Sequence, residues 1–152
     1  MRRLLVILFL LAVLPAFADA PVKGRIVKAL PLLLNLQGHD SLSPSLYDRD
    51  AYQVYLRLHT NEISAIRFDV LWSAKNSTAV KYRIRAELRG VSTNGTPSLQ
   101  TLQQDVKPAF FRRWTSLTLD GGDYKQFGSL VAWRVTLLAD DQKLCEQKSF
   151  LW

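Results

Sequence analysis

Apolar and polar residues alternate along several short segments of the chain. In the clearest example, Val80, Tyr82, Ile84, Ala86 and Leu88 alternate with charged side chains. Successive side chains of a strand point to opposite faces of a sheet, so a period of two is typical of a half-buried strand. This segment therefore predicts a strand with an apolar inner face and a charged outer face.

Further segments have the same extended character, and turn residues separate them. They are residues 24–38, 66–73, 99–106, 111–119, 130–139 and 143–152. Pro31 has no backbone N–H, which indicates an edge position or a bulge. No strand–helix–strand rhythm is present, so a parallel doubly wound sheet is not expected. The fold class predicted is mainly β: an antiparallel β-sandwich of six to seven strands with one short helical insertion after the first strand.

Residues 46–58 are the predicted helical insertion. Ser45, followed three residues later by Asp48, fits a capping box. Tyr47, Ala51, Val54, Tyr55 and Leu58 fall on one face of such a helix, opposite a polar face. Tyr52, Val54, Leu56 and Leu58 also alternate like a strand, so that alternative stays open. The capping signal favours the helix.

At the level of strand count and size, residues 24–152 resemble the immunoglobulin-like and fibronectin type III-like sandwiches. The resemblance implies that Trp72 and Trp133 fill the space between two sheets, as the buried Trp does there. Antibody-type domains also carry two cysteines, whereas Cys145 is the only cysteine here. No internal disulfide can form, so the thiol is either buried or available for pairing with another molecule. The layout and the "SFLW" ending also look like those of small exported bacterial proteins.

The first twenty residues have the three parts of a secretory signal peptide. Arg2 and Arg3 give a positive start, residues 4–14 are an unbroken apolar run, and Ala18 follows as a small residue at a cleavage position. We expect cleavage after Ala18 and a single mature domain, residues 19–152, in the periplasm or outside the cell. The alternative is a retained anchor, but a helical run of this length spans only about half of the hydrocarbon core.

The formal net charge of +7 directs attention to cationic surfaces. Pairing residues 66–73 with residues 80–89, with Asp69 opposite Arg83, keeps both apolar sets on one face and gathers cations on the other. Phe110 to Trp114 form an aromatic–arginine patch, and such residue types dominate binding hot spots. The candidate binding residues are Arg67, Lys81, Arg83, Arg85, Arg89, Arg112, Arg113 and Trp114.

Two interpretations of the basic face remain open. A flat cationic sheet could bind an anionic envelope polymer through salt-sensitive contacts. Alternatively, the charges are solvated and discourage aggregation, which the sequence favours. Nucleic acid is not an expected partner, because its readers interleave exposed aromatic residues with the cations.

Catalytic and metal-binding signals are weak. His39 lies in a loop with Asp40 and several serines, which allows a small hydrolase as an alternative, but no G-x-S-x-G turn presents a nucleophile. The His and Cys spacing does not match a zinc site. We therefore expect no metal and no cofactor. Asn76 and Asn94 fit the N-glycosylation pattern in predicted loops.

These patterns together predict an exported, non-catalytic accessory or binding module. Its expected partner is another envelope or secreted protein or an anionic polymer, and the membrane is met only transiently through the signal peptide.

Overall fold

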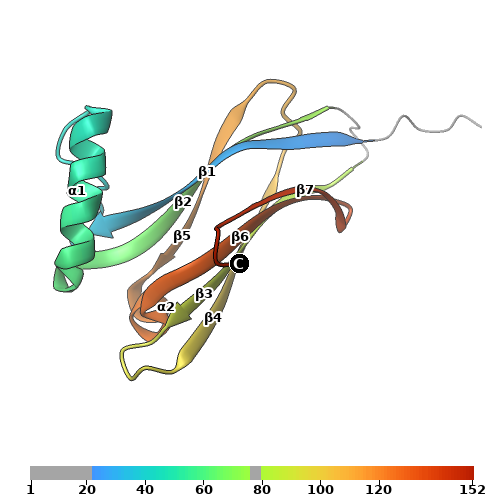
Figure 1. Cartoon of the computed structure of the whole chain (residues 1–152). Coiled ribbons are helices and arrows are strands. Elements are labelled where there is room, and N and C mark those ends of the chain that lie inside the picture. Colours follow the sequence, from blue (N-terminus) through green and yellow to red (C-terminus); the bar gives the residue numbers. More distant parts are fainter. Residues whose placement is uncertain (1–21, 76–79) are drawn as a thin grey trace, which may run out of the picture.

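The computed structural model describes residues 22–75 and 80–152, which form seven strands in two antiparallel sheets. The predicted signal peptide with Ala18, and Asn76, lie outside this part. The three-stranded sheet has the order β1 (Lys23–Asn35), β2 (Ile63–Lys75), β5 (Arg113–Asp120) (Figure 1). The four-stranded sheet has the order β4 (Pro97–Val106), β3 (Tyr82–Val91), β6 (Ser129–Ala139), β7 (Gln142–Lys148). The mainly β, antiparallel prediction is confirmed.

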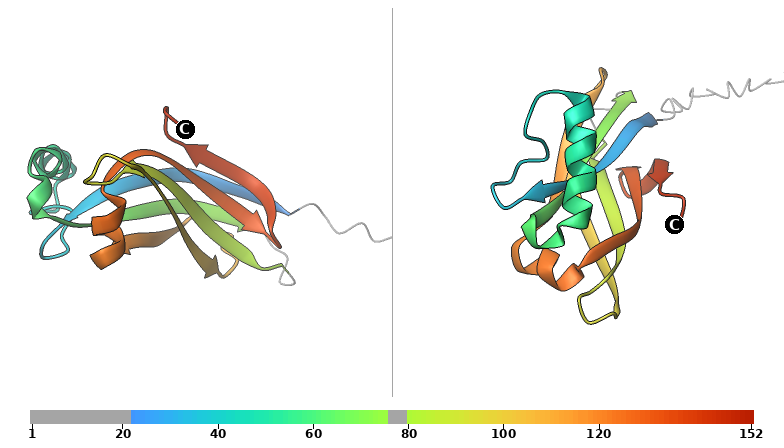
Figure 2. Two further views of the ribbon diagram at one scale, coloured as in Figure 1. Left: turned by 90° about the horizontal axis from the view of Figure 1, so that it is seen from below. Right: turned by 60° about the vertical axis from the view of Figure 1, so that its left-hand side comes forward.

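Buried side chains from both sheets form a single core. Phe68 and Val70 of β2 are fully buried, as are Ile84 of β3 and Val135 of β6. Trp72 is also fully buried, and its indole N–H donates to the Thr115 hydroxyl at 2.9 Å. The predicted position of Trp72 between the sheets is therefore confirmed. The two sheets lie as two layers, with the helices gathered at one end (Figure 2).

The predicted pairing of residues 66–73 with residues 80–89 is wrong. β2 pairs with β1 and β5, whereas β3 pairs with β4 and β6, so the chain crosses from one sheet to the other after β2. Asp69 faces Leu30 and Ser116 across the sheet, and Arg83 faces Asp105 and Leu138. Alternation shows which side chains of a strand face the core, but it does not show which strands pair. Two strands that face the same core can belong to opposite sheets.

The edge position indicated by Pro31 is confirmed. β1 lies at one edge of the three-stranded sheet, and this position accommodates Pro31. β4 lies at one edge of the four-stranded sheet. β6 carries a bulge, because Leu130 and Ala132 face Gly90 and Arg89 while Val131 between them has no partner on β3.

The helix predicted over residues 46–58 is confirmed as α1 (Leu46–Leu58). The Ser45 hydroxyl accepts from the backbone N–H of Asp48, as an N-cap does. The Asp48 carboxylate accepts from the Ser43 hydroxyl at 2.6 Å, so only half of the expected capping box is present. Gln53 and Leu56 are the buried residues of α1, whereas Tyr47, Val54 and Leu58 are exposed. The apolar stripe of the helix therefore faces outward.

A second helix occupies a segment predicted as a loop. α2 (Gly121–Phe127) connects β5 of one sheet to β6 of the other. Phe127 is fully buried at the end of the core, and a Cβ on Gly90 would lie 2.6 Å from its ring. The helix ends at Gly128, whose φ of 80° favours glycine. Two glycines at its start make this helix hard to predict from propensity.

The last predicted strand is shorter than expected, because β7 ends at Lys148. Ser149 still bonds to Trp133, donating its N–H to the Trp133 carbonyl at 2.9 Å. Phe150 is fully exposed, while the ring of Trp152 lies beneath the guanidinium groups of Arg89 and Arg134 at 4.0 and 4.7 Å. Residues 149–152 thus lie against the outer face of the four-stranded sheet.

Candidate functional site

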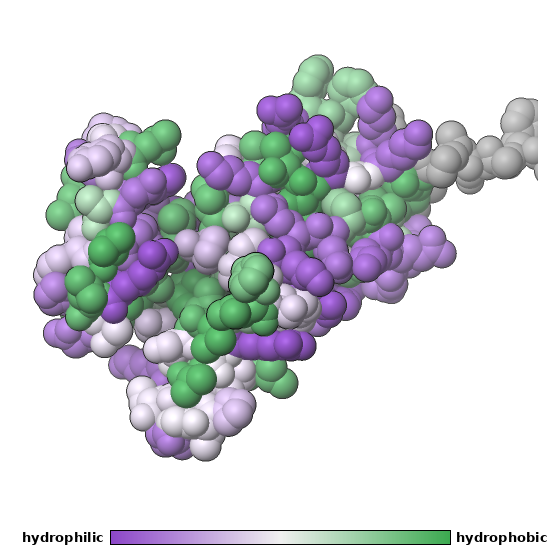
Figure 3. Space-filling model, viewed as in Figure 1, coloured by the Kyte–Doolittle hydropathy of each residue, from purple (hydrophilic) through white to green (hydrophobic). Residues whose placement is uncertain are grey.

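A groove opens at the helical end of the space between the two sheets. Its volume is about 690 Å³. Leu33 of β1 and Ile66 of β2 line one side, and Leu130 and Trp133 of β6 line the other. We call this cavity the end groove. It appears in Figure 3 as a hollow with apolar side chains at its base, between α1 and the rest of the molecule.

Two short helical segments complete the wall of the end groove. Thr60 and Asn61 come from the 3₁₀ helix Thr60–Glu62 that follows α1, and Tyr124 comes from α2. Tyr124 is half-buried, and this burial raises the pKa of its phenol above the ordinary value of 10.0. The phenol is therefore neutral at physiological pH.

The charged residues that line the end groove are both cations. Arg57 lies near the end of α1, and Lys125 lies on α2. Both side chains are exposed, and neither forms an ion pair within the described residues. No carboxylate from the described part of the chain lines the cavity. The groove therefore combines an apolar base with a positive rim.

The buried amide of Gln53 fixes α1 beside this groove. Its Oε1 accepts from the Leu33 N–H at 2.7 Å, and its Nε2 donates to the Leu33 carbonyl at 2.9 Å. The same Nε2 donates to the Asp40 carbonyl at 2.9 Å, which holds the loop before the helix. These bonds satisfy the outer backbone groups of an edge strand, and so they explain why a polar residue of α1 is buried.

The predicted basic face does not exist as one surface. Arg67 lies on the outer face of the three-stranded sheet, whereas Arg83, Arg85 and Arg89 lie on the outer face of the four-stranded sheet. The expectation that these cations share one face fails with the pairing on which it rests. Two separate layers carry these cations on opposite sides of the core.

Two arginines of these faces, Arg83 and Arg67, form ion pairs with carboxylates. Arg83 pairs with Asp105 at 2.7 Å and with Asp141 at 3.1 Å. The hydrogen bond and charge of Asp105 raise the pKa of Arg83 further. Arg67 pairs with Asp69 at 2.9 Å and with Asp40 at 3.3 Å. Partial burial works to lower the pKa of Arg67, but these two carboxylates outweigh it and the pKa is raised.

Three further predicted binding residues are Lys81, which precedes β3, and Arg85 and Arg89 on β3. Arg89 stacks on Trp152, as described above. The backbone N–H of Lys81 donates to the Asp140 carboxylate at 2.9 Å, and the Lys81 side chain is exposed. Arg85 is half-buried and faces Gln103 and Thr136 on the neighbouring strands.

The aromatic–arginine patch lies in the connection between β4 and β5 and at the start of β5. Phe110, Phe111 and Trp114 are all exposed, as are Arg112 and Arg113. The loop is held by buried Ala109, whose carbonyl accepts from the Ala74 N–H at 2.8 Å. Trp114 is therefore exposed, and the patch does not line the end groove.

The predicted His39 hydrolase set is not assembled. The Ser41 hydroxyl donates to the Ser43 carbonyl at 2.6 Å, and the Ser43 hydroxyl donates to Asp48. Within the described residues, no hydrogen bond joins either hydroxyl to the His39 imidazole. His39 instead uses its backbone, donating to the Asn35 side chain at 2.9 Å and so closing a tight turn.

Metal ligands and membrane-spanning helices can be assessed for the same residues. In residues 22–75 and 80–152, no group of three or more His, Cys, Asp or Glu side chains is placed to hold a metal ion. None of the helices in these ranges has the length and apolar character needed to cross a bilayer.

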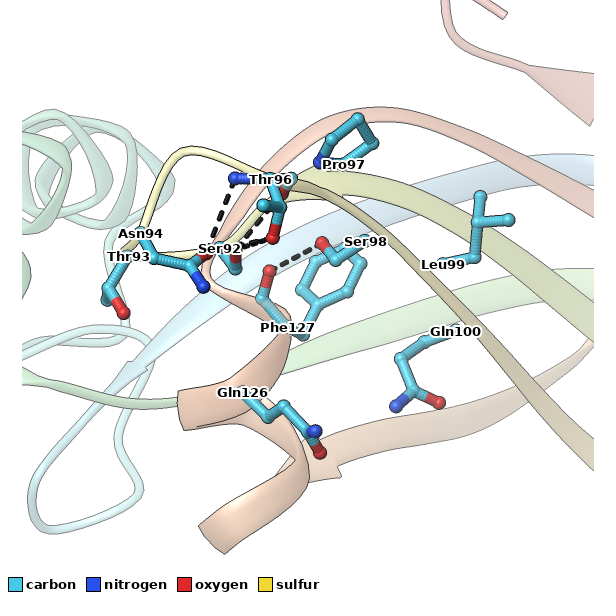
Figure 4. Close-up of a pocket in the computed structure, with 10 residues that line it drawn as sticks. All are labelled: Ser92, Thr93, Asn94, Thr96, Pro97, Ser98, Leu99, Gln100, Gln126 and Phe127. Carbon is cyan, nitrogen blue, oxygen red and sulfur yellow. Dashed lines mark hydrogen bonds between the residues drawn. The ribbon is translucent and has the colours of Figure 1, made fainter.

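A shallower hollow of about 450 Å³ lies over the turn between β3 and β4 (Figure 4). Its polar groups are bonded to one another: the Thr96 hydroxyl donates to Asn94 at 2.8 Å, and the Ser98 hydroxyl donates to the Phe127 carbonyl at 2.6 Å. Asn94, the second predicted glycosylation position, is exposed in this turn. The hollow offers fewer apolar contacts than the end groove.

Sequence reasoning missed the end groove. Its cations, Arg57 and Lys125, come from a predicted helix and a segment predicted as a loop, and they are far apart in the chain. No local pattern brings them together, because the groove exists only once both sheets and both helices are in place. The comparisons do not add a relative: no family model matches the chain, and neither the curated proteins nor the solved structures yielded a match.

Proposed function

We propose that the chain is an exported, non-catalytic accessory or binding module built on an immunoglobulin-like β-sandwich. The pattern of residues 1–18 supports export to the periplasm or the cell exterior. Two antiparallel sheets of three and four strands that share one core support the sandwich assignment.

The observation that carries the binding role is the end groove. A concave, mainly apolar cavity with a few polar or charged groups at its rim is the usual form of a ligand site. Arg57 and Lys125 at its rim have no acidic partner among the described residues. The outer sheet faces support a binding role less well, because Arg67 and Arg83 are already paired with carboxylates.

Native mass spectrometry of the protein recovered after export tests the binding role. Val131 lines the end groove and is exposed, so Val131→Trp should fill the cavity. Leu99→Trp adds the same bulk on an exposed position of β4 outside the groove. We expect a small-molecule adduct on the parent and on Leu99→Trp, and none on Val131→Trp.

Two results would contradict the proposal. One is an adduct that persists in Val131→Trp, which would place the ligand elsewhere. The other is turnover of ester or glycoside substrates that disappears in His39→Ala, which would favour the hydrolase alternative.

A further inference from the structure

The backbone that borders the end groove is poorly suited to pair with an extended peptide. On β1, Pro31 has no N–H, and both outer groups of Leu33 are bonded to Gln53. On β6, Val131 forms a bulge, and the Trp133 N–H donates to the Ser149 hydroxyl at 3.0 Å. Strand addition obtains its affinity from free main-chain groups, and bulges and proline oppose it. The ligand must therefore be recognised by other means.

Apolar contact is the main interaction that the base of the groove can offer. Ile66 is buried there, and Leu33, Ile63, Leu130 and Trp133 are partly buried around it. The volume of about 690 Å³ lies within the range of roughly 300–1,000 Å³ typical of small-molecule sites. A flexible alkyl chain fits a surface of this kind.

The charge at the rim selects the other end of the ligand. Arg57 and Lys125 come from different helices, and no described carboxylate lines the cavity to neutralise them. A guanidinium and an ammonium bind a carboxylate through charge-assisted hydrogen bonds, which are about twice as strong as neutral ones. The rim thus favours an anionic group above an apolar base.

We propose that the end groove binds a single-chain anionic amphiphile, namely a fatty acid. The alkyl chain lies against Leu33, Ile66 and Trp133, and the carboxylate lies between Arg57 and Lys125. This inference rests on the proposed function and names the ligand class of the same groove.

Quenching of Trp133 fluorescence by 9,10-dibromostearate tests the position of the chain. Bromine quenches an indole on contact, and Trp133 is the tryptophan that lines the groove. Trp72 is fully buried in the core, and Trp114 lies in the aromatic–arginine patch. We expect saturable quenching of the full-chain protein below the concentration at which the acid forms micelles, and loss of most of this quenching in Trp133→Phe.

A charge-matched pair of variants tests the head group. Arg57→Gln with Lys125→Gln should raise the Kd for dibromostearate about tenfold or more, since each removes a charged hydrogen-bond donor. Arg25→Gln with Lys107→Gln removes the same charge from exposed positions outside the groove and should change the Kd by less than about twofold. The neutral methyl ester of the probe should bind as weakly as the acid binds to the first double variant.

Each alternative outcome has a definite meaning. Absence of quenching, or quenching that survives in Trp133→Phe, overturns the fatty-acid site. Equal binding of acid and ester overturns recognition of the carboxylate. If dibromostearate fails while native mass spectrometry still finds an adduct that Val131→Trp removes, the inference falls and the binding role stands. An apolar, acidic peptide that binds the groove when the fatty acid does not would likewise replace this ligand class.

Discussion

Gln53 acts at the edge of β1 as a neighbouring strand would, because its amide bonds both the N–H and the carbonyl of Leu33. Gln53→Leu keeps a similar side-chain size but leaves these partly buried groups without partners. An unsatisfied buried group costs about 1–3 kcal/mol, so we expect the free energy of unfolding in urea to fall by about 2 kcal/mol. Gln104→Leu, on an exposed position of β4, should change it by less than about 0.5 kcal/mol. Equal stability of the two variants would contradict this role.

Cys145 makes the stability of the protein decrease at alkaline pH. It is half-buried, and burial raises the pKa of its thiol above the ordinary 9.0, while a backbone hydrogen bond with Ile26 lowers it less. The folded pKa therefore exceeds the unfolded one. The stability that this group contributes is fully present below about pH 9 and is lost as the pH rises through the folded pKa.

We therefore expect the free energy of unfolding to fall as the pH rises above about 9 in the parent and to fall less in Cys145→Ala. Tyr124, whose pKa is also raised by burial, should leave a residual decline of the same sign in the variant. In addition, Ellman's reagent should react more slowly with the native thiol than with the urea-unfolded thiol, because the thiolate is the reactive form. Identical pH profiles for parent and variant would show that the thiol ionises as freely in the native state as in the unfolded one.

At the scale of elements, α1 presents two leucines to opposite environments. Leu56 is fully buried, whereas Leu58 is 77% exposed. Leu56→Ala should lower the free energy of unfolding by about 2–5 kcal/mol, because it removes packed methyl groups and leaves a cavity. Leu58→Ala should change it by less than about 0.5 kcal/mol. Denaturation of the two variants under the same conditions checks the orientation of the helix, and a reversed order would mean that the apolar stripe faces inward.

The limits of α1 follow from local chemistry, while its orientation does not. Ser45 and Asp48 mark its start in the sequence, and the structure begins the helix there. The choice of which face packs inward depends on the unpaired edge of β1, which only Gln53 of the helix can satisfy with two hydrogen bonds. Hydropathy alone does not predict that Gln53 faces the sheet, because hydropathy treats a buried glutamine as unfavourable.

At the scale of the whole molecule, the alternation of apolar and polar residues predicts which side chains are buried better than it predicts which strands pair. The inward set of β2 and the inward set of β3 were both identifiable, and Phe68 and Ile84 are indeed fully buried. Two strands with alternating apolar residues can face one core from the same sheet or from two facing sheets. The pattern therefore could not exclude the incorrect pairing. The end groove is harder still to predict, since Arg57 and Lys125 come from two helices and line one cavity only in the complete arrangement.

Gly24 of β1 lies against leucine side chains of the other sheet, where there is no room for a Cβ. A Cβ at this position would lie 2.7 Å from both Leu137 Cδ2 and Leu144 Cδ1, which belong to β6 and β7. Gly24→Ala forces these core and edge side chains apart and should lower the free energy of unfolding by about 1–3 kcal/mol, and Gly24→Val should lower it further. Gly122→Ala in α2 meets nothing within 4 Å, so the same substitution there should raise stability by about 0.5–1 kcal/mol. Urea unfolding of the two alanine variants should therefore give changes of opposite sign. A neutral or stabilising Gly24→Ala would mean that the contact between β1 and the other sheet is looser than these distances require.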